Sequence, residues 1–201
     1  MVAMEPPATL EEEFNDWYDT EHVPERRTVP GFDSATRLVC VSGWPRYLAF
    51  YDLREHSVID EPGYQAISGV HFSPWSKRIL ARVRGLWRAH GTQIHGDEQL
   101  LGQLLRLVMI RFCSISVARE KALVEQLKKL VSEWPGTPRL KVLRNQAGES
   151  GQYVALIALS NIQNAVHTDI SRLGEFSDKV DLLNEYTPYW SRADLPGFSV
   201  P

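Results

Sequence analysis

The feature that most constrains this fold is a similarity between the two halves of the chain. Each half contains, in the same order, a helix end, a Pro-Gly turn, a strand, a glycine-containing turn and a strand that begins with tyrosine. Residues 29–53 carry this order in the first half and residues 134–160 carry it in the second. Further along, FSPWSKR at 72–78 matches YTPYWSR at 186–192. Matches that recur in one order indicate an internal duplication.

The duplicated unit is predicted to have the order β-α-β-β-α-β. Short apolar or alternating segments predict strands, and apolar residues spaced by three and four predict helices. In the first half the predicted strands are Val2–Glu5, 35–41, 47–53 and 82–90, and the helical stretches are 10–22, 55–68 and 72–83. Thr9 is predicted to cap the first helix, which is expected to end at about His22, with Pro24 as a helix-breaker or in a final bent turn.

The second half repeats this order. Its predicted strands are 104–115, 140–143 and 153–159, and its predicted helices cover 118–134 and begin again at Asn161. The polar, glycine-containing stretch 90–103 is predicted to join the two units.

An antiparallel sheet with helices on one face leaves its other face bare, and a bare apolar face must be covered. Two such sheets in one chain can cover each other. We therefore predict an α+β fold of two tandem ferredoxin-like β-α-β-β-α-β units, 1–95 and 96–201, with antiparallel sheets packed face to face as a dimeric-type α/β barrel. Pairing between two chains, giving a homodimer, stays open.

Charge and cysteine content exclude several classes of function. The formal net charge is −3, which gives no general attraction to nucleic acid or to an anionic membrane. Cys40 and Cys113 lie in apolar, strand-like segments, and their spacing indicates neither a zinc site nor a redox pair. The sequence has no basic start followed by an apolar run and no segment long enough to cross a bilayer. We expect a cytoplasmic protein that binds no metal, nucleic acid or membrane.

Aromatic and titratable residues are concentrated in the segment EFNDWYDTEHVPERRTVPGF, residues 13–32. Tyr18 and His22 are four residues apart and share a helix face. A histidine beside a carboxylate can exchange protons near neutral pH, and a tyrosine can donate a hydrogen bond to a developing oxyanion. The predicted catalytic residues are therefore His22, Tyr18, Asp19 and Glu21. The alternative for His22 is a structural role, as a cation that complements the dipole of a helix C-terminus.

The segment FNDWYDTEHVPERRTVPGF, followed by a hairpin and SPWSKR, resembles the dimeric α/β-barrel proteins and is most similar to their EthD-like branch. The resemblance implies a pocket between sheet and helices with His22 near its mouth. Cofactor-free monooxygenases, polyketide cyclases and dehydratases, isomerases and haem proteins share this fold, so the fold alone does not define the reaction. The corresponding segment LKKLVSEWPGTP of the second half has no histidine, so any site is expected in the first unit.

A further set of aromatic and histidine residues is predicted to bind substrate, because ligand sites are mostly apolar with few polar groups. Within it, Tyr47, Ala49 and Tyr51 share one strand face, which we expect to line the barrel interior, while Leu48 and Phe50 meet the helices. The predicted substrate-binding residues are Trp17, Trp44, Tyr47, Tyr51, His71 and Trp75. Packing in the core is the alternative for the strand tyrosines.

These patterns lead to a hypothesis about function. The chain is expected to be an enzyme that acts without a bound cofactor on a small aromatic or polyketide-like substrate, through proton transfer at His22. Cyclisation, dehydration, isomerisation and oxygenation all fit. A barrel that binds a small molecule or haem without catalysis is the alternative.

Overall fold

The structure is a computed structural model that describes residues 1–96, 104–147, 151–160 and 168–189. It has an α+β fold with antiparallel strands. The chain forms two compact units. Among the described residues, the first contains 1–39, 44–88 and Tyr189, and the second contains 40–43 and the described part of 89–188. The predicted division at residue 95 therefore differs from these units by the excursion at 40–43, the stretch 89–95 and the position of Tyr189.

The first unit contains a sheet in the order β4-β1-β3-β2, with every described neighbour pair antiparallel. Its strands are β1 (Val2–Glu5), β2 (Phe32–Ser42, of which 40–42 belong to the second unit), β3 (Tyr47–Leu53) and β4 (Arg84–Arg88). In register, Ala49 lies opposite Val2 on one side and Arg37 on the other. Strand β3 therefore lies inside the sheet, with β1 on one side and β2 on the other.

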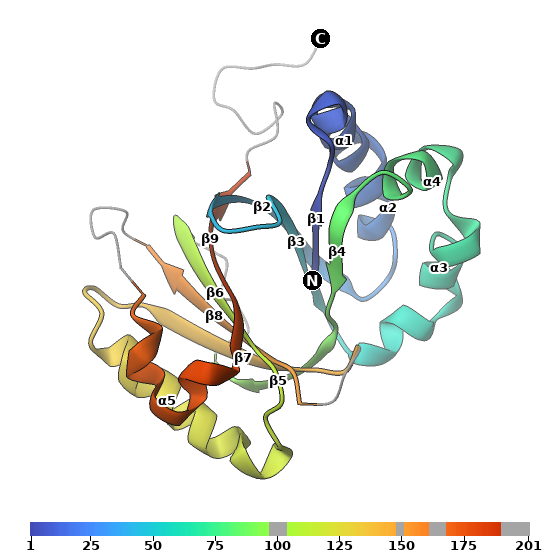
Figure 1. Cartoon of the computed structure of the whole chain (residues 1–201). Coiled ribbons are helices and arrows are strands. Elements are labelled where there is room, and N and C mark those ends of the chain that lie inside the picture. The colour runs from blue at the N-terminus through green and yellow to red at the C-terminus, as the bar shows by residue number, and fades with distance from the viewer. Residues whose placement is uncertain (97–103, 148–150, 161–167, 190–201) are drawn as a thin grey trace. The chain divides into compact units, whose positions relative to one another are not determined.

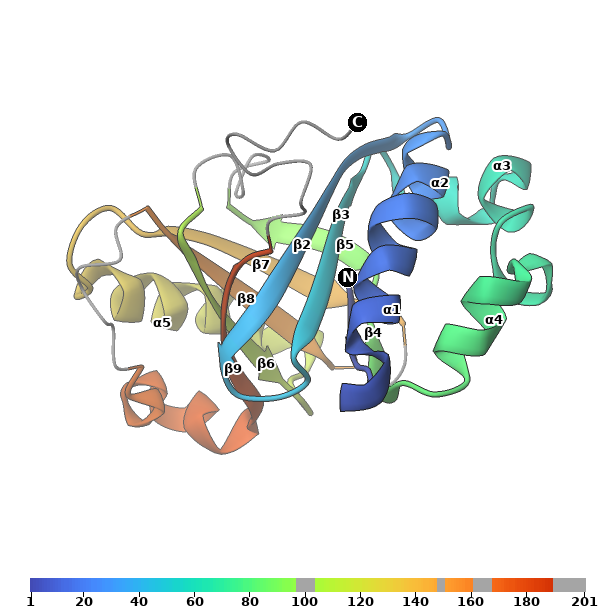
Figure 2. The ribbon, with the colours of Figure 1, turned by 90° about the horizontal axis from the view of Figure 1, so that it is seen from above.

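The helices of the first unit lie on one face of this sheet (Figures 1 and 2). Next to the strands is one helical segment built of η1 (Ala8–Leu10), α1 (Glu11–Trp17), η2 (Tyr18–His22) and α2 (Val23–Arg27). Then follow η3 (His56–Asp60), α3 (Pro62–Gln65), η4 (Gly69–His71) and α4 (Pro74–Leu80). Ser73 caps α4, its hydroxyl accepting a hydrogen bond from the Ser76 amide.

The first helix does not stop at about His22; the bent turn expected to contain Pro24 is α2, which follows a change in helix geometry. Residues Tyr18–His22 form a π-helical turn, in which the Val23 amide donates to the Tyr18 carbonyl five residues earlier. This wider turn lets a new helical segment begin, with Pro24 in its first turn, where a missing N–H is tolerated. Thr9 is likewise not the cap, because it lies inside the short 3₁₀ turn before α1.

The core of the first unit lies between the sheet and this helical segment. Phe14, Trp17 and Tyr18 pack against Tyr47 and Ala49. The expected orientation of β3 is therefore wrong: Tyr47, Ala49 and Tyr51 face the helices, whereas Leu48 and Phe50 lie on the opposite face. Both faces of β3 are apolar, so alternation along the sequence could not decide between them.

The second unit contains a sheet in the order β9-β6-β8-β7-β5. Its strands are β5 (Gly91–His95), β6 (Arg106–Phe112), β7 (Arg139–Asn145), β8 (Tyr153–Leu159) and β9 (Val180–Pro188). Strand β5 falls in the segment predicted to be a polar join; it pairs with β7, and the rest of that segment, 97–103, lies outside the described residues.

One face of the second sheet is covered by η5 (Val117–Arg119), α5 (Glu120–Ser132) and η6 (Ile170–Lys179), as Figure 1 shows. Leu123, Leu127 and Leu130 of α5 pack against Val108 and Ile157 of the sheet. Of the helix predicted to begin at Asn161, residues 161–167 lie outside the described residues. In the described part of the chain, no helix is long and apolar enough to cross a membrane.

Candidate functional site

His22 lies at the end of the π-helical turn, on the face that packs against the sheet. Its side chain is only 7% exposed. The imidazole ring lies 4.2 Å from the ring of Trp17 and 5.1 Å from that of Tyr18, measured between centroids. The structure thus brings together three of the residues that the sequence singled out.

Two buried polar atoms in this region lack a hydrogen-bond partner among the described residues, His22 Nδ1 and the Tyr51 hydroxyl. The Tyr18 hydroxyl has a long contact, 4.0 Å, to Met4 Sδ, and the Tyr51 hydroxyl lies close enough to lower the pKa of Tyr18. Most buried polar atoms in proteins are hydrogen-bonded, so unpartnered ones call for an explanation. Both unpartnered atoms belong to neighbours of Tyr18, whose ring lies 5.1 Å from that of His22 and whose hydroxyl affects the pKa of Tyr51.

Burial sets the ionisation of all three groups. Loss of hydration, followed by the nearby charges of Arg26 and Arg37, holds the pKa of His22 well below 6.5. The imidazole is therefore neutral at neutral pH. Burial also raises the pKa of Tyr18 to about 12 and that of Tyr51 well above 10, so both phenols keep their protons.

Arg26, which the sequence analysis did not single out, follows His22 by four residues. Its side chain is buried, with 4% exposed. The guanidinium is 3.0 Å from Glu25 Oε2, donates to the Ile67 carbonyl at 3.4 Å and lies 5.9 Å from the Phe72 ring centroid. The spacing of four residues places Arg26 on the same helix face as His22 and could have indicated their proximity. Two arginines before a turn, however, more often form a solvated helix end.

Arg37, on β2, was also missed. Its guanidinium donates to Asp19 Oδ1 and to Asn15 Oδ1, both at 2.6 Å. It lies 4.4 Å from the ring centroid of Tyr18 and 3.9 Å from that of Tyr189. The Tyr189 hydroxyl in turn donates to Asp19 Oδ2. Asp19 therefore holds the π-helical turn to β2 and to Tyr189.

Glu21 is held in a second network. One of its carboxylate oxygens accepts hydrogen bonds from Ser73, at 2.5 Å, from Ser76 and from the Trp17 indole. Trp17 also donates to the Ser76 hydroxyl at 3.0 Å. This network attaches the π-helical turn to the N-terminus of α4.

The remaining predicted binding residues are spread around the first unit. The Tyr47 hydroxyl donates to Glu11 at 2.6 Å, and burial is the main cause that raises its pKa to about 12. Trp75 donates to Glu13 at 3.1 Å. His71 is exposed in η4, and Trp44 is 54% exposed with its ring against Gly85. Trp17 and Tyr51 lie near His22, whereas nothing described brings Trp44 there.

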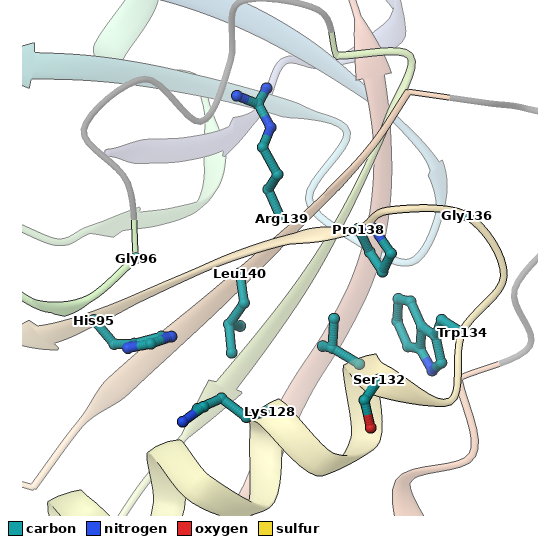
Figure 3. A pocket seen from close by; sticks show the side chains of 10 residues that line it. His95, Gly96, Lys128, Ser132, Trp134, Gly136, Pro138, Arg139 and Leu140 are labelled. Carbon is teal, nitrogen blue, oxygen red and sulfur yellow. The ribbon is translucent and has the colours of Figure 1, made fainter.

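The second unit contains a cavity of about 660 Å³ between the C-terminal part of α5, the end of β5 and the start of β7 (Figure 3). Val131, Trp134 and Leu140 give it an apolar floor, and His95, Lys128 and Ser132 add polar groups. None of the predicted site residues lines it. Among the described residues, no three His, Cys, Asp or Glu side chains gather as metal ligands would.

Comparison with known proteins gives a fold rather than a family. No family model and no curated protein matches the chain. Solved structures do match. An anthrone oxidase-like protein superposes with a TM-score of 0.66 at 14% identity, over 94% of this chain and 89% of that one. A protein of Fusobacterium nucleatum assigned as a monooxygenase gives 0.51 at 9% identity, over 93% and 88%. The chain shares their fold.

Proposed function

We propose that this chain is a small-molecule enzyme that acts without a bound cofactor on an aromatic or polyketide-like ketone or phenol. His22 takes a proton from the substrate, and the hydroxyls of Tyr18 and Tyr51 hold the oxygen that becomes negative. The observation that carries the proposal is the buried, neutral imidazole of His22, whose Nδ1 has no partner among the described residues.

The proposed step starts from a neutral imidazole, which is the form able to accept a proton. A C–H or O–H bond of the substrate breaks, its proton goes to His22, and its electron pair stays on the substrate as an enolate or phenolate. The two arginines that lower the pKa of His22 favour this anion. The negative charge on the substrate offsets the positive charges of the two arginines. It therefore also stabilises the imidazolium that forms on His22.

The strand orders support the rest of the proposal. The first unit has four strands in the order 4-1-3-2, and β9, β6, β8 and β7 of the second unit repeat this order, with β5 added beside β7. This is the order of a ferredoxin-like module, and we infer a tandem pair related to the EthD-like branch of the dimeric α/β barrels. Their face-to-face packing stays a prediction. The similarity to an anthrone oxidase-like protein suggests oxygenation as the reaction type.

Anthrone in air-saturated buffer tests the proposal. Removal of one methylene proton gives the anthrone anion, molecular oxygen adds to that carbon, and loss of water yields anthraquinone, so one anthrone and one O₂ give one anthraquinone and one water. We expect O₂ uptake that matches anthraquinone formation, and a loss of about 100-fold or more in His22→Phe, as for removal of a general base. Equal rates for the two proteins would reject His22 as the base.

A binding role without turnover is the second candidate, because both predicted catalytic carboxylates are already engaged. Asp19 accepts from Arg37 and Tyr189, and Glu21 from Ser73, Ser76 and Trp17. Neither is described within hydrogen-bond distance of His22. Saturable binding of anthrone, with its oxidation no faster than in buffer, would favour this candidate.

A further inference from the structure

The interior of the first unit contains two buried arginines, Arg26 and Arg37, and each pairs with a carboxylate. Arg37 is matched closely by Asp19, at 2.6 Å. Arg26 is matched less well. Its partner is the adjacent Glu25, whose carboxylate is 31% exposed while the guanidinium is 4% exposed. Burial raises the pKa of Glu25 in spite of Arg26, and the Glu25 side chain lies closer to solvent than the guanidinium does.

Arg26 is also placed beside the unpartnered atoms. His22 and Arg26 are four residues apart along a continuous helical segment, so they share the face that packs inward. The Arg26 charge is the first electrostatic influence on His22, and it acts on Tyr18 and Tyr51 as well. A buried cation thus acts on the group that includes His22, whose Nδ1 has no hydrogen-bond partner among the described residues.

The contacts that cover Arg26 are weak enough to be exchanged for a ligand. One is the long hydrogen bond to the Ile67 carbonyl and the other is the Phe72 ring at 5.9 Å. Both residues belong to the short connection that includes η4. A ligand oxygen that carries a full negative charge would make a shorter and stronger bond to the guanidinium than a carbonyl does.

We propose that Arg26 selects the ionised form of the ligand, so that this interior binds a phenolate or enolate in preference to the neutral molecule. The Tyr51 hydroxyl donates to the same oxygen, and a ligand enters by displacing the Ile67 and Phe72 contacts. This inference rests on the proposed function for the location of the site. It goes further in naming the charge state of the ligand and the residue that reads it.

Binding of 4-nitrophenol tests this, because the dye ionises near neutral pH and its two forms differ in colour. The neutral control is 4-nitroanisole, which has the same ring without an ionisable hydroxyl. We expect the bound dye to be ionised at a pH where the free dye is largely neutral, and the anion to bind at least about tenfold more tightly than nitroanisole. Equal affinity for the two, or binding of neither, would overturn the inference.

Three variants assign the effect to one side chain. Arg26→Met should weaken nitrophenolate binding by about tenfold and leave nitroanisole unchanged, as removal of one charge contact does. Arg26→Lys keeps the charge and should restore most of the preference, which also serves if the methionine variant does not fold. Arg27→Met is the matched control, since Arg27 is the exposed neighbour on the same helix. An equal loss in Arg27→Met would mean that general surface charge attracts the dye.

The two proposals can fail separately. Preference for the anion without anthrone oxidation would remove the enzymatic function and keep the role of Arg26. Anthrone oxidation together with equal binding of nitrophenol and nitroanisole would do the reverse.

Discussion

At the scale of single residues, burial decides what His22 contributes to the folded state. Because its pKa in the folded protein lies well below 6.5, only the unfolded chain takes up a proton readily. Full stability is therefore present above about pH 6.5 and is lost as the pH falls from there towards the folded pKa. A structural cation at a helix end would show the opposite dependence.

The first prediction follows from this sign. Between about pH 7.5 and about pH 5.5, the wild type should lose about 1 kcal/mol of unfolding free energy that His22→Phe does not lose. Phenylalanine keeps a ring beside Trp17 and cannot titrate. Urea unfolding at the two pH values measures the difference. His71→Phe, at an exposed position, should behave as the wild type; the same dependence in His22→Phe would contradict a neutral buried imidazole.

Which residues gather around His22 was only partly predictable. Tyr18 and Trp17 are adjacent in sequence, so helical spacing sufficed to place them with His22. Arg26 was missed because its burial depends on the Ile67–Phe72 connection, about forty residues further along. Arg37 was missed because it lies in an apolar strand whose two faces the sequence could not tell apart. Both omissions concern contacts between segments, which local patterns do not encode.

At the scale of elements, the π-helical turn explains how one helical segment bonds both to strand β2 and to helix α4. In a regular α-helix the side chains of one face keep their direction, whereas one wider π-helical turn changes the direction of the side chains that follow it. Asp19, near the start of the turn, accepts a hydrogen bond from Arg37 on β2, and Glu21, near its end, accepts one from Ser73 at the start of α4. The sequence predicted the start of the first helix and the two hairpins within a few residues, but it did not place β9, and a π-helical turn leaves no periodic signature. Strand β5 was missed because its residues alternate poorly.

The turn between this helical segment and β2 gives the second prediction. Gly31 has φ of +92°, and a Cβ there would lie 2.5 Å from Val58 Cγ2. Gly31→Ala should therefore cost about 2 kcal/mol of unfolding free energy, through both strain and crowding. Gly63→Ala is the control, because Gly63 lies in α3 and a Cβ would meet nothing nearer than 3.7 Å. That variant should be unchanged or slightly more stable in urea unfolding, and similar losses in both would refute the argument.

At the scale of the whole molecule, the question is whether both units carry chemistry. The sequence led us to expect a site in the first unit alone, because the second lacks the histidine and its acidic, aromatic neighbours. The second unit nevertheless has a cavity lined by His95, Lys128 and Trp134, the last two from the very segment that matches 13–32. Similar strand orders in the two units therefore do not settle which half binds a ligand.

The last prediction separates the two halves. His95→Ala and Lys128→Ala remove the polar groups of the second cavity without touching the first unit. If the first unit binds the substrate, both variants should keep nitrophenolate affinity and anthrone turnover within about twofold, which is near the limit of measurement at about 0.4 kcal/mol. His22→Phe should lower nitrophenolate affinity by about tenfold and anthrone turnover by about 100-fold or more, since it removes the imidazole from the proposed site. Loss in either second-unit variant, with His22→Phe unaffected, would move the site to the cavity beside α5. In that case the buried imidazole of His22 would have a structural role, and the ligand site would lie in the second unit.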